Sequence, residues 1–153
     1  MPRKTHFNFP GVTQLIIQKS HKRGPCFFVD KDYQHYLHDL YNLSAKYNCH
    51  IHGYVLMPDH VQILATPYLD SGISHLMQEL SQRHVNHINT TYGQAGSLWG
   101  GGYKSCLVDS EQYLLTCMRY IELIPVRSGV VEQPAVNRWS SYYINALNKE
   151  DEI

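Results

Sequence analysis

The chain has 153 residues, of which 43% are hydrophobic, and these numbers predict a single domain with a core of its own. No apolar run approaches the length of a membrane span, and the first residues lack the apolar stretch of a signal peptide, so we expect a cytoplasmic protein with no membrane partner. Four scattered cysteines without a Cys-x-x-Cys pair predict reduced, inert thiols. The formal net charge is zero, although proteins that bind nucleic acid usually carry a basic excess.

The first half of the chain predicts one helix between strands. Residues 12–19 are β-branched and apolar enough for a strand. Asp30 is interpreted as the N-cap of a helix, because apolar residues follow it at helical spacing up to Ala45. Residues 49–57 and 60–66 predict two strands, and the Pro58-Asp59 pair between them predicts the tight turn of a hairpin.

The second half repeats the change from helix to strand. A second helix is predicted from Ser71 to about Tyr92, and the glycine-rich stretch 93–102 predicts a flexible loop. Residues 103–108 predict a fourth strand. A third helix then begins at about residue 110 and ends before Pro125, since proline cannot continue it.

The resulting order, strand-helix-strand-strand-helix-strand (βαββαβ), is the ferredoxin-like order. It predicts an α+β fold in which both helices cover one face of an antiparallel sheet. The third helix follows this unit. We expect one domain over residues 1–148 and a frayed acidic tail over 149–153.

Two short segments contain the polar residues with the most informative spacing. In Met57–Leu64, His60 and Gln62 alternate with apolar residues, so on a strand both side chains point from one face. In Arg119–Arg127, Tyr120 lies on the predicted third helix. Taken alone, a helical tyrosine in a chain with twelve tyrosines is usually a packing residue.

Together these segments resemble the HUH-type, single-tyrosine transposases of bacteria, above all the branch called REP-associated tyrosine transposases, which carry an IS200-like transposase domain. Further matches follow in order along nearly the whole chain: Pro10-Gly11-Val12, Cys26-Phe27-Phe28, Tyr54–Met57, Leu98-Trp99, Tyr103-Lys104, Leu107–Glu111 and Trp139–Tyr142. The resemblance implies a ferredoxin-like fold and a monomer or homodimer. It also implies that single-stranded or hairpin DNA is nicked and joined through a 5′-phosphotyrosine at Tyr120.

The resemblance further implies Mg²⁺ or Mn²⁺, held by two imidazoles of one strand and by a polar side chain one helical turn beyond the tyrosine. His60 matches the first imidazole, Gln62 occupies the second position, and Ile124 stands where family members usually have asparagine. The amide oxygen of Gln62 can bind Mg²⁺ or Mn²⁺, but Ile124 cannot bind any metal. The metal site is therefore degenerate, and we expect weak or absent metal binding and impaired cleavage.

Other residues near His60 leave alternatives open. Asp59 is the nearby carboxylate that could compensate as a ligand, although Pro-Asp at a hairpin turn is ordinary turn chemistry. His50 and His52 lie on the partner strand, where satisfied structural histidines are the stronger interpretation. A two-residue loop would pair His60 with Met57 and turn His52 to the opposite face, whereas a three-residue loop would reverse this.

The residues implied to contact DNA are basic and lie mainly after the first strand. They are Lys19, Lys22, Arg23, Lys104 and Arg127. Three functions are compared: a transposase-like nuclease, a non-catalytic DNA-hairpin-binding module derived from one, and a protein interaction domain that only the neutral charge favours.

Glycines 100–102 stand where family members tend to carry a carboxylate and an arginine, so this region loses charge and gains flexibility.

Overall fold

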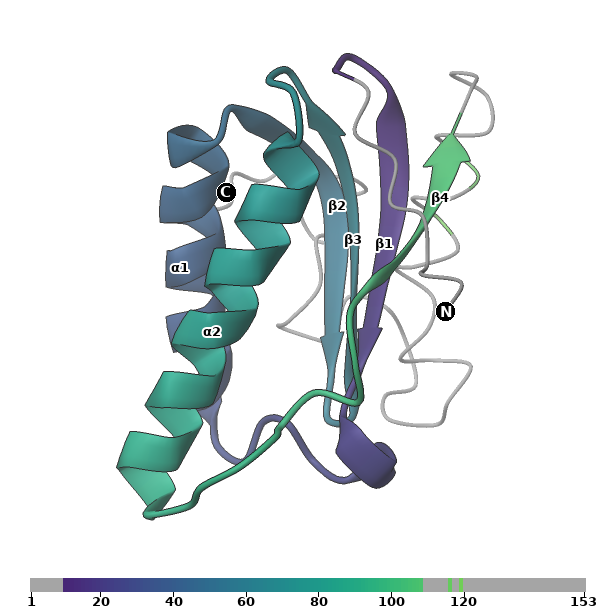
Figure 1. The fold of residues 1–153 in the computed structure, drawn as a ribbon. Helices are drawn as coiled ribbons and strands as arrows, with labels where there is room; N and C mark the ends of the chain where they lie inside the picture. Colours follow the sequence, from purple (N-terminus) through teal and green to yellow (C-terminus); the bar gives the residue numbers. More distant parts are fainter. Residues whose placement is uncertain (1–9, 109–115, 117–118, 120–153) are drawn as a thin grey trace, which may run out of the picture.

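The computed structural model describes residues 10–108, 116 and 119, and the structural statements below concern these residues (Figure 1). Their elements, in chain order, are β1 (Thr13–Lys19), the 3-10 turn η1 (His21–Arg23), α1 (Asp30–Lys46), β2 (Cys49–Met57), β3 (His60–Pro67), α2 (Gly72–Tyr92) and β4 (Lys104–Val108). Each predicted helix and strand of this region is present, with limits that differ by at most one residue.

The four strands form one antiparallel sheet in the order β2-β3-β1-β4. Helices α1 and α2 lie side by side over one face, so the α+β ferredoxin-like arrangement is confirmed (Figure 1). We call the face that points away from α1 and α2 the distal face. The predicted third helix lies outside the described residues except for Thr116 and Arg119, which are helical and exposed. The domain limits at 1 and 148 stay a prediction.

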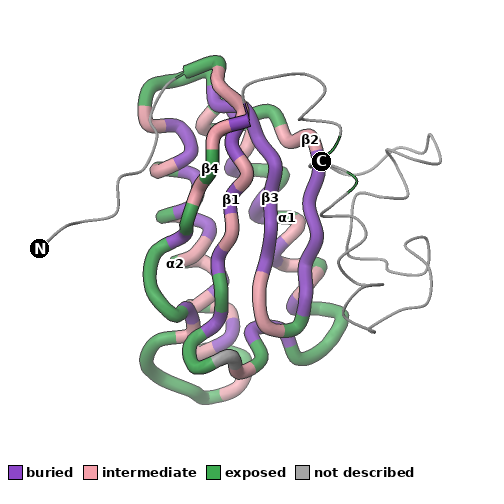
Figure 2. The backbone as a smooth tube through the Cα atoms, turned by 90° about the vertical axis from the view of Figure 1, so that its right-hand side faces the viewer, coloured by how far each residue is buried: buried purple, intermediate pink, exposed green. Residues whose placement is uncertain are grey.

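The main core lies between the sheet and the two helices. Side chains at helical spacing on α1, such as Tyr36, Leu40 and Leu43, meet Leu76 and Leu80 of α2 and are almost fully buried. Burial of each such side chain contributes about 2 kcal/mol. A smaller apolar cluster lies on the distal face and contains Leu15, Val55, Met57, Leu64 and Val108. Strand β3 therefore has buried residues on both faces, as its colour in Figure 2 shows.

The N-terminus of α1 differs from the sequence prediction. The N-cap residue is Val29, and Asp30 is the first residue inside the helix. The backbone N–H groups of Phe28 and Val29 instead donate to the carboxylate of Asp32, at 2.8 and 3.0 Å. A carboxylate in the third helical position can reach back to these free donors, and this geometry makes Asp32 the capping residue.

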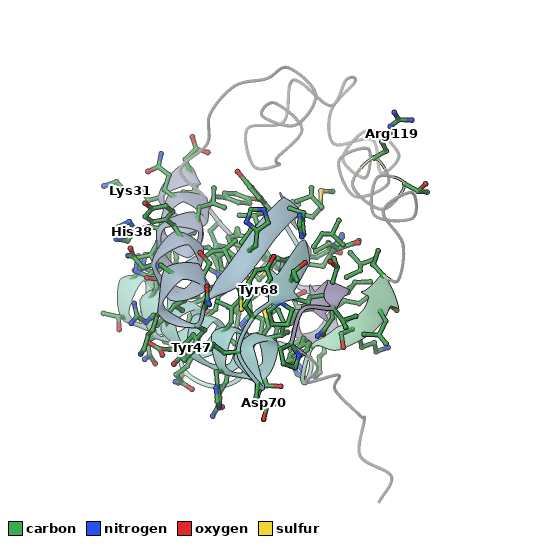
Figure 3. All side chains as sticks on the ribbon, turned by 90° about the horizontal axis from the view of Figure 1, so that it is seen from above. Lys31, His38, Tyr47, Tyr68, Asp70 and Arg119 are labelled. Atoms are coloured by element: carbon green, nitrogen blue, oxygen red, sulfur yellow. The ribbon has the colours of Figure 1, made fainter. Side chains whose placement is uncertain are left out.

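The two ends of the sheet have different character. Figure 3 views the end at which α1 leads into β2 and β3 leads into α2, with Tyr47, Tyr68 and Asp70 at these connections. Lys31 and His38 project from the outer side of α1 in the same view. Neither helix of the described region has the length and apolar character that a membrane span requires. The opposite end, where β1 leaves the sheet, carries the polar residues considered next.

Candidate functional site

The hairpin between β2 and β3 fixes the face on which the candidate residues lie. Its loop has two residues, Pro58 and Asp59, so Met57 lies opposite His60, and Gln62 pairs two positions further along. His60 and Gln62 both point from the distal face, as their alternation predicts. The turn lies next to β1, because Ser20 N–H donates to the Asp59 carbonyl at 2.9 Å.

The imidazole of His60 is oriented by its sequence neighbour. Its Nδ1 lies 2.9 Å from Oδ1 of Asp59, and since a carboxylate only accepts, Nδ1–H is the donor; in the neutral ring the lone pair is then on Nε2. The side chain of His60 is 19% exposed and remains accessible at the edge of the turn. Asp59 thus contacts the His60 ring on the side away from Gln62. It orients the imidazole and does not stand in for a missing metal ligand, which was the alternative considered from the sequence.

Gln62 presents an unsatisfied acceptor beside this imidazole. Gln62 is 6% exposed, and its Oε1 has no hydrogen-bond partner among the described residues. A buried carbonyl oxygen without a partner costs about 1–3 kcal/mol. Its Nε2 lies 3.5 Å from Nε2 of His60, and a half turn of the amide would bring Oε1 to that position.

These two side chains fit a divalent cation as part of a ligand set. The lone pair of His60 and the carbonyl oxygen of Gln62 are both metal donors, and a histidine that binds metal usually donates its other N–H to a carboxylate, as His60 does to Asp59. The described residues contain no group of three or more His, Cys, Asp or Glu side chains arranged for a metal. Ile124 and Tyr120 lie outside the described residues, so their predicted roles stay predictions.

The histidines of β2 lie elsewhere, and one of them corrects the sequence analysis. A β-bulge between Ile51 and Gly53 turns His52 to the distal face, although the hairpin loop has two residues. His52 Nε2 lies 2.7 Å from the Thr66 hydroxyl, and its ring meets that of His50 at 4.6 Å. Thr66 lies at the far end of β3, roughly 20 Å from His60 along the strand. These two histidines are therefore apart from the His60 site.

Three of the predicted basic residues border the site. Lys19 lies directly opposite His60 in the sheet, and Lys104 lies opposite Ile17, which pairs with Gln62. Both lysines are exposed on the distal face. Lys22 is exposed in the η1 turn that follows β1, with a left-handed φ of 54°. Arg23 belongs to the same turn, and Arg127 lies outside the described residues.

The glycine-rich segment is anchored to this end of the sheet where we expected flexibility. Trp99 forms a β-bridge with Ser20, and Gly100 N–H donates to the Lys19 carbonyl at 2.9 Å. A Cβ atom on Gly100 would lie 3.0 Å from the Ser20 carbonyl oxygen, so a larger residue would push the two backbone segments slightly apart, and glycine suits this close approach. Charge is absent here as predicted, but residues 98–100 are held by backbone hydrogen bonds.

A buried support behind the turn was missed by the sequence analysis. Cys26 N–H donates to the Pro58 carbonyl at 2.7 Å, and the Cys26 carbonyl accepts from Nε2 of His84 at 2.7 Å. Burial lowers the pKa of His84 to about 4, which keeps the ring neutral. The sequence signal that could have revealed this support is a histidine on the apolar face of α2. Its hydrogen-bond partner, the Cys26 carbonyl, is 58 residues earlier in the chain.

The chain is similar to known proteins in sequence and in fold. Residues 14–123 match the family described as "Transposase IS200 like". The chain is similar to a solved REP-associated tyrosine transposase bound to a REP hairpin, with 17% identity, a TM-score of 0.80, and coverage of 100% of this chain and 94% of that one. A candidate transposase of Deinococcus radiodurans R1 is 18% identical with a TM-score of 0.53, covering 80% and 95%. At these identities the two structures show a shared fold. No curated protein matches the chain.

Proposed function

Because the chain belongs to the family of IS200-like transposases, we propose that it binds single-stranded or hairpin DNA at the end of the sheet formed by β1, η1 and the β2–β3 turn. The observation that carries this proposal is the oriented His60 beside the unsatisfied Gln62 oxygen, with Lys19 across the sheet. Exposed Lys22 and Lys104 add positive charge around the pair, which suits a phosphate backbone. The solved relative bound to a REP hairpin supports the choice of partner.

The proposed reaction is nicking and joining of that DNA. The hydroxyl oxygen of Tyr120 loses its proton and forms a bond to the scissile phosphorus, the bond from phosphorus to the 3′ oxygen breaks, and the departing 3′ oxygen takes up a proton to become a hydroxyl. Attack of that 3′ hydroxyl on the phosphotyrosine reverses the step and rejoins the strand. Bound Mg²⁺ or Mn²⁺ would stabilise negative charge on the phosphate. His60 and Gln62 would hold the ion, and Asp59 would keep the imidazole turned toward it.

Cleavage in this chain is impaired under the same proposal. Gln62 supplies an amide oxygen, which is a weaker donor to transition metals than imidazole, and the apolar Ile124 supplies no donor. The second candidate function, a non-catalytic DNA-hairpin-binding module, rests on this same loss of ligands. The two functions differ in cleavage and agree in DNA binding, so metal binding and cleavage separate them.

The test is titration of Mn²⁺ by calorimetry, followed by cleavage of labelled hairpins with and without Mn²⁺. Native protein should bind Mn²⁺ weakly, and Gln62→His combined with Ile124→Asn should bind it at least tenfold more tightly, because imidazole is a stronger donor than the Gln62 amide and asparagine adds a donor where Ile124 has none. His60→Ala should abolish binding, whereas the matched control His50→Ala should not, since His50 is at the other end of the sheet.

Tight binding by native protein that these substitutions leave unchanged would contradict the assignment of His60 and Gln62 as ligands. Nicked product with a protein-linked 5′ end would establish the nuclease. Hairpin binding without any product, even in the restored double variant, would establish the binding module.

A further inference from the structure

Two histidines of the distal face lie far from the candidate site. His50 and His52 are two residues apart on β2, so both side chains point from one face of that strand. They belong to the end of the sheet that Figure 3 views, whereas the β2–β3 turn with His60 lies at the opposite end (Figure 1). The proposed function uses neither residue.

The two imidazole rings are spaced as two ligands of one ion are. Their centres are 4.6 Å apart, and their planes meet at 71°. Two imidazoles that bind one metal ion, each through a nitrogen about 2.0–2.1 Å from it, have ring centres roughly 4.5–5 Å apart. His50 is exposed and His52 is partly buried, so an ion can reach the pair from solvent. The spacing therefore allows both rings to bind the same ion with little movement.

The ring of His52 is held by two threonine hydroxyls of the neighbouring strands. Its Nε2 lies 2.7 Å from the Thr66 hydroxyl, which in turn bonds to the hydroxyl of Thr13 on β1. When the Thr66 oxygen accepts from Nε2–H, the lone pair of the neutral ring is on Nδ1. A histidine that binds metal usually has its other ring nitrogen fixed by such a bond. Burial, and after it the nearby His50, lowers the pKa of His52 below its ordinary value, which favours the neutral form that a metal requires.

The donor atoms determine which ion suits the pair. Imidazole suits zinc, copper and nickel, whereas Mn²⁺ is at the weak end of the affinity order of divalent transition metals. No third His, Cys, Asp or Glu side chain among the described residues completes a set with the pair, so water would fill the remaining positions. From this arrangement we propose that His50 and His52 chelate a divalent ion of the zinc and copper class. This site is separate from the one that the proposed function assigns to Mg²⁺ or Mn²⁺.

The experiment titrates Zn²⁺ into His60→Ala protein by calorimetry. This variant removes the imidazole of the candidate functional site, so the result does not depend on the proposed function. Zn²⁺ should bind about tenfold more tightly than Mn²⁺, or better. His50→Gln and His52→Gln, each added to His60→Ala, should weaken Zn²⁺ binding by about tenfold or more, because an amide is a weaker donor to a transition metal than imidazole. His50 is exposed, so its replacement leaves the core intact.

A control variant and a second measurement test the location. His75 is an exposed histidine of α2 whose ring lies against Tyr47, so His75→Gln should leave Zn²⁺ binding unchanged. Thermal unfolding is the second measurement. At about a hundredfold excess over its Kd, Zn²⁺ should raise the Tm of His60→Ala protein by about 5 °C, because the ion binds the folded pair more tightly than the histidines of the unfolded chain. This rise should vanish when His50→Gln is added.

Three outcomes would overturn this inference. They are the absence of Zn²⁺ binding by His60→Ala protein, binding that persists undiminished in the His50→Gln and His52→Gln variants, and a loss in His75→Gln as large as theirs, which would indicate ordinary binding to surface histidines. Hairpin affinity in the absence of metal should be the same for native protein and His50→Gln. Failure of both to bind hairpins would therefore count against the proposed function and leave the zinc result standing.

Discussion

Replacing Asp32 with alanine tests whether this carboxylate holds the start of α1 and the loop that supports the candidate site. Asp32 is fully buried and accepts four hydrogen bonds: from the Phe28 and Val29 backbone at 2.8 and 3.0 Å, from His87 Nε2 at 2.9 Å and from the Tyr92 hydroxyl at 2.8 Å. Asp32→Ala leaves all four donors without this acceptor. The loop from Gly24 to Val29 then loses the bonds of Phe28 and Val29 to Asp32 and keeps the bond from His84 to the Cys26 carbonyl.

The expected loss follows from these bonds. Each of the two backbone donors contributes about 1 kcal/mol as a helix cap or a net hydrogen bond, and the partly buried His87 contributes a similar amount. Tyr92 is given no share, because its hydroxyl can turn to water. Asp32→Ala should therefore lower the free energy of unfolding by about 3 kcal/mol, which corresponds to a fall in Tm of about 10 °C for a domain of this size.

Urea unfolding followed by circular dichroism measures this change, and Asp30→Ala is the matched control. Asp30 lies in the same helical turn and is exposed, so its removal should cost less than about 1 kcal/mol, mainly through the helix dipole. Equal losses for the two variants would refute the assignment of Asp32 as the cap. A loss below about 1 kcal/mol for Asp32→Ala would refute the estimate from its hydrogen bonds.

The pH dependence of the Asp32 variant gives an independent check. Burial by itself would raise the pKa of Asp32, but the hydrogen bonds from Tyr92, Phe28, His87 and Val29 outweigh burial and hold it below its ordinary value. The unfolded chain therefore takes up a proton at higher pH than the native protein does. The stabilisation is fully present above about pH 4, the ordinary value, and is lost as the pH falls through the folded pKa. The difference between native protein and Asp32→Ala should shrink over that acidic range.

Three further predictions concern other residues. Burial lowers the pKa of His84 from its ordinary value of about 6.5 to about 4. Between these two pH values the unfolded state therefore binds more protons than the native state. Native stability should thus fall by up to about 3 kcal/mol over that range, and His84→Phe should flatten this part of the pH profile measured by urea unfolding. Lys22→Ala with Arg23→Ala should weaken binding to all hairpins alike and reduce the log–log salt slope by about 1.4, whereas a steep, unchanged slope would show that the phosphates are contacted elsewhere. Tyr120→Phe should leave hairpin affinity intact and abolish the protein–DNA adduct on denaturing gels; an adduct that persists would identify another nucleophile.

Local pattern determined much of the fold. The apolar spacing in α1 and α2 and the alternation in β3 predicted these elements within one residue of their limits, because helix and strand periods depend on which face is buried. The alternation in β3 likewise predicted that His60 and Gln62 share one face, whereas the sequence left open the length of the loop at Pro58-Asp59 and with it the register. The two shared a face by strand geometry alone, which is why the sequence could predict it.

Features that join distant segments were decided only by the tertiary structure. The bulge at His52 depends on how β2 fits against β3, so counting residues from the turn gave the wrong face. Asp32 rather than Asp30 caps α1 because His87 and Tyr92, contributed by α2, meet it in the buried interior. The glycine segment is fixed where we expected flexibility, since Gly100 fits against Ser20 about 80 residues earlier in the chain. Such contacts leave no periodic signal, because each depends on the position of a partner that local sequence does not encode.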